Sequence, residues 1–121
     1  MPSPHTLLVV DGHTGVRLAL SERLRRAPRI GAVHAAGTLH EALALARAHA
    51  PHAAICDPTT VGADMADAVR QLRREVAHVL VLGAVVLDHE RAALLGAGAN
   101  AVLLKGDTTR LLEEIAALAD R

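Results

Sequence analysis

The chain has 121 residues, with 13 Lys and Arg against 13 Asp and Glu, and it contains no Phe, Tyr or Trp. The balanced charge argues against a domain that binds nucleic acid through a positive field of its own. The missing rings exclude a site that stacks bases or flat cofactors on aromatic side chains. A chain of this length can still bury the core of one domain with Leu, Val, Ile and Ala.

The only cysteine, Cys56, lies inside an apolar run, which is typical of a small buried residue in a reducing compartment. No apolar stretch approaches the roughly 20 residues of a membrane span, and the segment Met1 to His5 lacks the basic start of a secretory signal. We therefore expect a cytoplasmic protein with no membrane partner.

Five short apolar runs predict five strands. They are apolar at consecutive positions rather than at alternate ones, which indicates strands buried on both faces of a parallel sheet. The predicted strands are Thr6 to Val10, Ala32 to Ala36, Ala53 to Asp57, Val79 to Leu82 and Ala101 to Leu104.

Amphipathic segments between these runs predict five helices. The first is expected to begin at a Thr14 cap, to bury Val16, Leu20 and Leu24 on one stripe and to end before Pro28. The second helix is expected over Leu39 to Ala50, with Thr38 and Glu41 as a capping box. The third begins at Asp64 or Asp67, and the fourth is capped by Asp88 and reaches Ala97. Thr108 or Thr109 caps the fifth.

Strict alternation of strand and helix predicts a flavodoxin-like (βα)5 three-layer sandwich, because parallel strands need helical crossovers. We expect the strand order 2-1-3-4-5 and one domain over residues 1–121. In that order Asp11 and Asp57, each at the end of a strand, meet at the switch point of the sheet, and Lys105 follows the last strand at the same edge.

Three motifs carry a family resemblance: Leu8-Val-Val-Asp-Gly-His13, Ala54-Ile-Cys-Asp57 and Ala97-Gly-Ala-Asn-Ala-Val-Leu-Leu-Lys105. They resemble the CheY-like receiver domain of response regulators over nearly the whole chain. The segments Glu41 to Arg47 and Lys105 to Asp107 look most like receivers that precede LuxR-type (NarL/FixJ-like) helix-turn-helix domains. The resemblance implies a role in transcription regulation, with DNA bound only through an effector domain outside this sequence.

The resemblance also implies roles for individual residues. Asp57 matches the phosphoacceptor, which a histidine kinase or a small phosphodonor would modify, Asp11 matches an acidic pocket residue, and Lys105 matches the phosphate-contacting lysine. Mg²⁺ would be held by Asp11, Asp57 and the backbone carbonyl of Thr59. A hard divalent cation is needed because a carboxylate nucleophile and a phosphoryl group repel each other.

Three positions depart from the family pattern. Gly12 replaces the second acid, Gly83 replaces a Ser or Thr at the end of strand 4, and Val102 replaces the aromatic residue of strand 5. We therefore expect weak or absent Mg²⁺ binding, impaired or absent phosphorylation and no enzymatic activity. Output would come from homodimerisation, a bound small molecule or the resting conformation. Pro58 is expected to hold Asp57 extended, and the Thr59 hydroxyl is expected to serve only the turn.

Helices 1 and 5, or helix 4 with strand 5, are the candidate dimer faces, with Leu20, Leu24, Leu94 and Leu118 nearby. Two alternative functions remain open: an ordinary phosphoacceptor receiver of a two-component system, and a cobalamin-binding module in which Asp11-Gly-His13 starts an Asp-x-His-x-x-Gly motif. The eight histidines are interpreted as solvated side chains because none are four residues apart on one helix.

Overall fold

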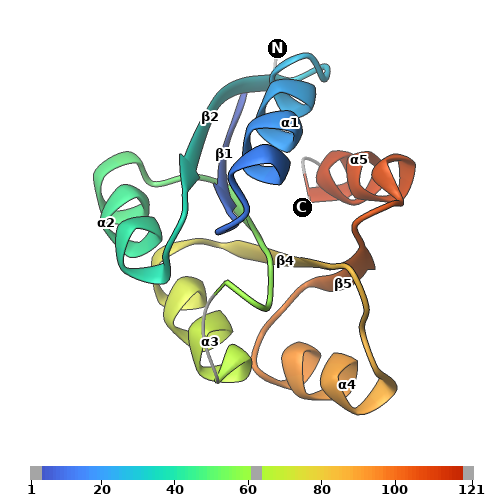
Figure 1. Ribbon diagram of the computed structural model, residues 1–121. Coiled ribbons are helices and arrows are strands. Elements are labelled where there is room, and N and C mark those ends of the chain that lie inside the picture. Colours follow the sequence, from blue (N-terminus) through green and yellow to red (C-terminus); the bar gives the residue numbers. More distant parts are fainter. Residues whose placement is uncertain (1–3, 61–63, 119–121) are drawn as a thin grey trace.

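The computed structural model describes residues 4–60 and 64–118 (Figure 1). Strand and helix alternate five times in chain order, and the five parallel strands form one sheet with the order β2-β1-β3-β4-β5. The predicted flavodoxin-like (βα)5 fold is therefore confirmed. The elements are β1 (His5–Val10), α1 (Thr14–Arg25), β2 (Ile30–Ala36), α2 (Leu39–His49), β3 (Ala53–Cys56), α3 (Met65–Glu75), β4 (His78–Gly83), α4 (Asp88–Gly96), β5 (Ala101–Leu104) and α5 (Thr108–Leu118).

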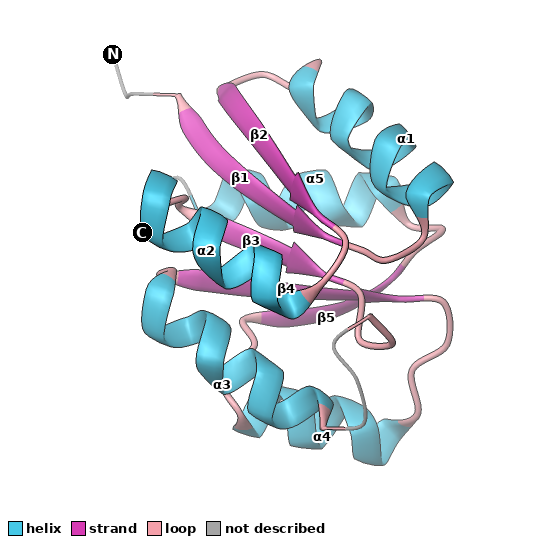
Figure 2. Ribbon diagram, turned by 60° about the vertical axis from the view of Figure 1, so that its left-hand side comes forward, coloured by secondary structure: helices cyan, strands magenta, loops and turns pink. Residues whose placement is uncertain are grey.

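The sheet is the middle of three layers (Figure 2). Leu7 and Val9 of β1 join a core cluster with residues of α1 and α5, whereas Leu8 and Val10 join a second cluster with residues of α2, α3 and α4. Consecutive side chains of a strand point to opposite faces, so the continuously apolar run of β1 fills both cores. The carboxyl ends of all five strands consequently lie at one edge of the sheet.

Two of the predicted helix caps are correct and three are wrong. The Thr38 hydroxyl accepts a hydrogen bond from the Glu41 amide, and Asp64 caps α3. Thr14 is the first residue of α1 rather than its cap, because His13 occupies that position without a side-chain cap. Leu87, not Asp88, precedes α4, and α5 is capped by the Asp107 carboxylate, which accepts from the Arg110 amide, rather than by Thr108 or Thr109.

The structure corrects the expected surface of the helices. Val16 was expected in the buried stripe of α1 but is 40% exposed, and only Leu24 of that stripe is fully buried. Leu94 and Leu118 are buried too, so these three leucines cannot form a dimer face. The exposed large apolar side chains are Val16, Leu18, Val85, Leu87, Leu95 and Leu104. Within the described ranges, no helix is long and apolar enough to cross a bilayer.

Candidate functional site

Backbone hydrogen bonds position the three charged residues at the carboxyl edge of the sheet. The Asp11 amide donates to the Ala36 carbonyl, and the Asp57 amide donates to the Val10 carbonyl. The Lys105 amide donates to the carbonyl of Gly83 on the neighbouring strand. Each residue thus extends the ladder by one position past its strand, which fixes the direction of its side chain.

Asp11, Asp57 and Lys105 lie close together in the structure, as predicted. The Lys105 ammonium lies 2.9 Å from Asp11 Oδ2 and 3.0 Å from Asp57 Oδ1. The two carboxylates are only 2% and 4% exposed. A carboxylate this deeply buried is costly without a partner, and one ammonium shared between two carboxylates supplies both partners.

Two threonines complete the shell of Asp57. The Thr59 hydroxyl donates to Asp57 Oδ2 at 2.6 Å, and the Thr60 hydroxyl donates to the same oxygen at 2.8 Å. Thr60 also accepts from the Gly12 amide at 2.7 Å. The expectation that the Thr59 hydroxyl serves only the turn is therefore wrong. A turn directly after a strand-end acid brings the next hydroxyls back toward its carboxylate.

The hydrogen bonds decide the charge state of the pair. Burial alone would raise the pKa of Asp57, but hydrogen bonds from Thr59, Thr60 and Lys105 outweigh burial and hold that pKa below its ordinary value. Burial would lower the pKa of Lys105, yet its hydrogen bonds to Asp11 and Asp57 raise it instead. Asp57 and Lys105 are consequently a stable carboxylate–ammonium pair at neutral pH.

Cys56, next to Asp57 in the sequence, is 1% exposed. Burial raises the pKa of its thiol to about 12, with the nearby charges of Asp57 and Asp11 adding to the effect. The thiol therefore stays protonated, as the prediction of a small buried residue requires.

A possible metal ligand set lies beside the lysine. Nδ1 of His13 is 2.9 Å from Asp11 Oδ1 and 3.9 Å from Asp57 Oδ2, and one ligand atom from each of these residues lies within 4.8 Å of the others. Gly12, at the position of the missing acid, brings no ligand atom. The residues fit a divalent cation with two carboxylates and an imidazole, one carboxylate fewer than the resemblance implies.

Four of the histidines interpreted as solvated side chains also contact one another, and all four are exposed or half-buried. The rings of His34 and His49 stack with centroids 3.8 Å apart, and those of His5 and His52 pack edge to face at 4.8 Å. Burial, together with the charges of His49 and Arg25, lowers the pKa of His34. These pairs join different elements, so spacing along one helix could not have revealed them.

The carboxyl end of β4 is apolar, and so is the interior of β5. A Cβ at Gly83 would lie 2.9 Å from Val86 Cγ2 and 3.3 Å from Pro58 Cγ, so these two side chains occupy the space beside the glycine. Val102 is 2% exposed and belongs to the core cluster shared with α2, α3 and α4. The Arg91 guanidinium donates to the Val102 carbonyl and joins α4 to β5.

No family model and no curated protein matches the chain, whereas many solved structures do. The signal receiver domain of the response regulator NarL from Mycobacterium tuberculosis matches with a TM-score of 0.87 and 27% identity over 98% of both chains. A LuxR-family two-component response regulator from Aurantimonas sp. SI85-9A1 matches with 0.86 and 27%, over 98% of this chain and 88% of that one.

A response regulator from Burkholderia pseudomallei, solved with a phosphorylated aspartic acid, a calcium ion and citrate, has a TM-score of 0.80 and 24% identity, over 95% of this chain and 66% of that one. At that identity it supports the fold alone. The first two matches agree with this one in fold, and they cover nearly the whole of this chain. The chain therefore has the fold of CheY-like receiver domains and is similar, over nearly its whole length, to those of response regulators.

Proposed function

We propose that this receiver acts with impaired or absent phosphorylation of Asp57, and that it regulates transcription through dimerisation or its resting conformation. DNA would be bound by an effector domain outside this sequence. The observation that carries the proposal is the closed hydrogen-bond shell of Asp57, in which Lys105 engages one carboxylate oxygen and two threonine hydroxyls engage the other.

The shell opposes phosphoryl transfer because its hydrogen bonds stabilise the resting carboxylate and draw electron density away from the nucleophile. The attacking oxygen would lose part of that stabilisation on forming a bond to phosphorus, and Mg²⁺ would approach carboxylates that already have an ammonium beside them. The lowered pKa of Asp57 reports the same stabilisation of the resting carboxylate. Gly12 adds to the effect, since a missing carboxylate weakens the attraction for a divalent cation.

The apolar part of the edge supports the second half of the proposal. A phosphoryl group shifts a two-state equilibrium only through contacts that differ between the states. Gly83 has no hydroxyl to follow a phosphoryl oxygen, and Val86 and Pro58 fill the space where such a side chain would stand. Val102 is an aliphatic residue locked in the core and has no ring to reorient.

Exposed leucines favour the face of α4 and β5 for self-association. Leu87, Leu95 and Leu104 are 44% to 52% exposed, and the Arg91 hydrogen bond to Val102 holds α4 against β5. Sedimentation equilibrium should detect a dimer that Leu95→Glu weakens and Leu18→Glu, a substitution of an exposed leucine on α1, leaves intact. A monomer at all concentrations would remove dimerisation from the proposal.

The decisive experiment is incubation with acetyl phosphate and Mg²⁺ followed by intact-mass measurement. We expect little or no adduct under conditions that modify the receiver of the Burkholderia pseudomallei protein, whose aspartate is phosphorylated in its solved structure. A stoichiometric adduct that disappears in Asp57→Ala would contradict the proposal. It would establish the alternative that the Asp57–Lys105 pair favours, an ordinary phosphoacceptor receiver with a histidine kinase as its partner.

A further inference from the structure

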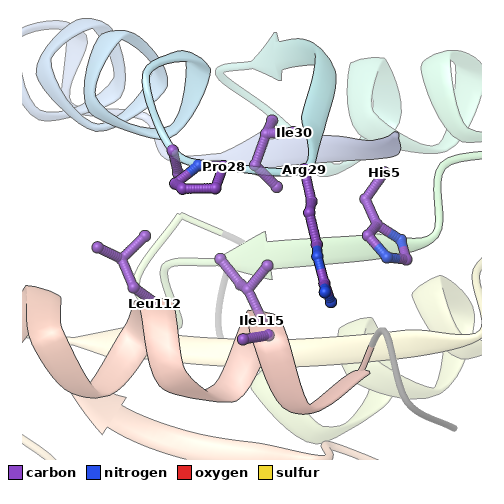
Figure 3. A pocket seen from close by; sticks show the side chains of 8 residues that line it. His5, Pro28, Arg29, Ile30, Leu112 and Ile115 are labelled. Carbon is purple, nitrogen blue, oxygen red and sulfur yellow. The ribbon is translucent and has the colours of Figure 1, made fainter. Parts of the chain in front are cut away.

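A second site candidate lies at the opposite edge of the sheet, where β1 begins. A cavity of about 210 Å³ opens between the end of α1, the loop into β2 and one face of α5 (Figure 3). It is far from the charged cluster, because His5 begins β1 and lines the cavity whereas Asp11 follows the end of the same strand. An inference about this cavity does not depend on the chemistry of Asp57.

The cavity combines an apolar wall with two basic side chains. His5 and Arg29 are its basic members, and no acidic residue is among the described residues that line it. The apolar wall comes from Ala27, Pro28, Ile30, Leu112, Ile115 and Ala116. Such a lining, apolar with a few polar groups in fixed places, is typical of small-molecule sites.

Arg29 has an unusual backbone conformation. Its φ of +67° lies in the left-handed region, which Gly and Asn adopt at lower cost than a long side chain. The conformation lets the Arg29 carbonyl accept a hydrogen bond from the His5 amide. That hydrogen bond explains the backbone conformation at position 29. It does not explain why the residue is an arginine, because the carbonyl of an Asn at this position would accept the same bond.

Among residues 4–60 and 64–118, the Arg29 guanidinium has no anionic partner. Arg26, Arg47 and Arg110 pair with glutamates, whereas Arg29 has no ion pair with any of residues 4–60 and 64–118. In Figure 3 its side chain extends from the start of β2 toward α5, alongside the cavity. An exposed cation beside an apolar cavity, with no counter-ion among the described residues, is complementary to a ligand that carries both an anion and a hydrocarbon body.

We propose that this cavity binds a small monocarboxylate with an apolar body about the size of a benzene ring. A cavity of about 150 Å³ is enough to admit benzene, so 210 Å³ leaves room for a carboxylate as well. The body packs between Ile30, Leu112 and Ile115. The carboxylate makes a two-point hydrogen bond with the Arg29 guanidinium, a geometry that the planar fork of arginine favours.

The test is a titration of the ¹⁵N-labelled chain with sodium benzoate, followed by ¹H–¹⁵N correlation spectra. We expect saturable shifts at residues around the cavity with a Kd of about 1 mM. Benzyl alcohol, which keeps the ring and loses the charge, should bind at least tenfold more weakly. Sodium sulfate, which keeps a charge and loses the ring, should give no saturable shifts at these residues.

Two variants and one control separate binding from folding. Arg29→Asn should weaken benzoate binding about tenfold while its Tm stays equal or rises, because Asn accepts the left-handed conformation. Ala116→Leu should weaken binding by filling the cavity, and Arg70→Gln, which removes an exposed charge on α3, should leave binding unchanged. Benzoate affinity unaltered in Arg29→Asn, equal affinity for benzyl alcohol, or shifts confined to Asp11, Asp57 and Lys105 would each overturn the proposal.

Discussion

The two halves of the carboxyl edge of the sheet are built on opposite principles. At β1 and β3, two buried carboxylates share the Lys105 ammonium, which follows β5, and two threonine hydroxyls donate to Asp57. At β4 the strand ends in Gly83, beside the apolar side chains of Val86 and Pro58, and the neighbouring β5 has the buried Val102 in its interior. A receiver fold can therefore keep the charged half of its site while apolar side chains pack in the other half.

The first half depends on its lysine, so we expect the largest effect from Lys105→Met. The variant leaves two buried carboxylates facing each other without a counter-ion, which should cost about 3 kcal/mol of the free energy of unfolding. Urea denaturation measures the loss. Arg110→Met is the matched control because it breaks the exposed ion pair with Glu114, and it should cost about 0.5 kcal/mol. Equal losses of unfolding free energy in the two variants would contradict the idea that the buried carboxylates depend on Lys105.

The second half is tested by restoring a side chain at its glycine. Gly83→Thr should destabilise the fold by about 2 kcal/mol, because its Cβ would meet Val86 at 2.9 Å and Pro58 at 3.3 Å. Combining it with Val86→Ala should recover most of that loss, and thermal unfolding of the two variants makes the comparison. A double variant as unstable as Gly83→Thr alone would contradict the idea that Val86 fills the space.

The pKa shifts predict how stability depends on pH. The pKa of Asp57 lies below its ordinary 3.8 in the folded chain, so its contribution is present above that pH and is lost as the pH falls below it. The pKa of Lys105 lies above its ordinary 10.5, so its contribution is present below that pH and is lost as the pH rises past it.

Asp57→Asn should therefore flatten the acid limb of a plot of unfolding free energy against pH and should reduce the alkaline limb in part, since Asp11 still faces Lys105. If the acid limb of Asp57→Asn stayed as steep as that of the parent chain, the stabilising role of the Asp57 carboxylate in the charged half would be contradicted.

The smallest expected effect concerns the missing acid. Gly12→Asp places a third carboxylate next to Asp11, and its Cβ would lie 3.3 Å from the Gly37 carbonyl, so a small shift accommodates it. Two unit charges about 4 Å apart in water attract by about 1 kcal/mol. Mg²⁺ carries two charges but salt screens an exposed pocket, so we expect a gain of about 1 kcal/mol, or about fivefold in Mg²⁺ affinity. Calorimetric titration measures the Mg²⁺ affinity. Gly15→Asp is the control, because a Cβ at Gly15 would meet no atom within 4 Å. An unchanged affinity would contradict the role assigned to Gly12.

Local signals were enough to predict the fold. Continuous apolar runs indicate buried parallel strands, and their alternation with amphipathic segments leaves few topologies that avoid left-handed crossovers. The convergence of Asp11, Asp57 and Lys105 follows from the same logic, because every strand of a parallel sheet ends at the same edge. The caps were predicted less well, since Asp88, Thr108 and Thr109 are plausible caps by residue type and only the backbone shows which residue precedes each helix.

The hydrogen-bond partners and packing neighbours of these groups become apparent only in the folded chain. Sequence order could not show that Thr59 and Thr60 donate to Asp57 or that Val86 and Pro58 fill the space at Gly83. Nor could it show that Arg29 lies at a cavity with no anionic partner among residues 4–60 and 64–118. The two kinds of feature depend on interactions over different separations along the sequence. Strand and helix formation depends on patterns over a few residues, whereas hydrogen-bond partners, free volume and counter-ions depend on groups that meet only once the layers have packed.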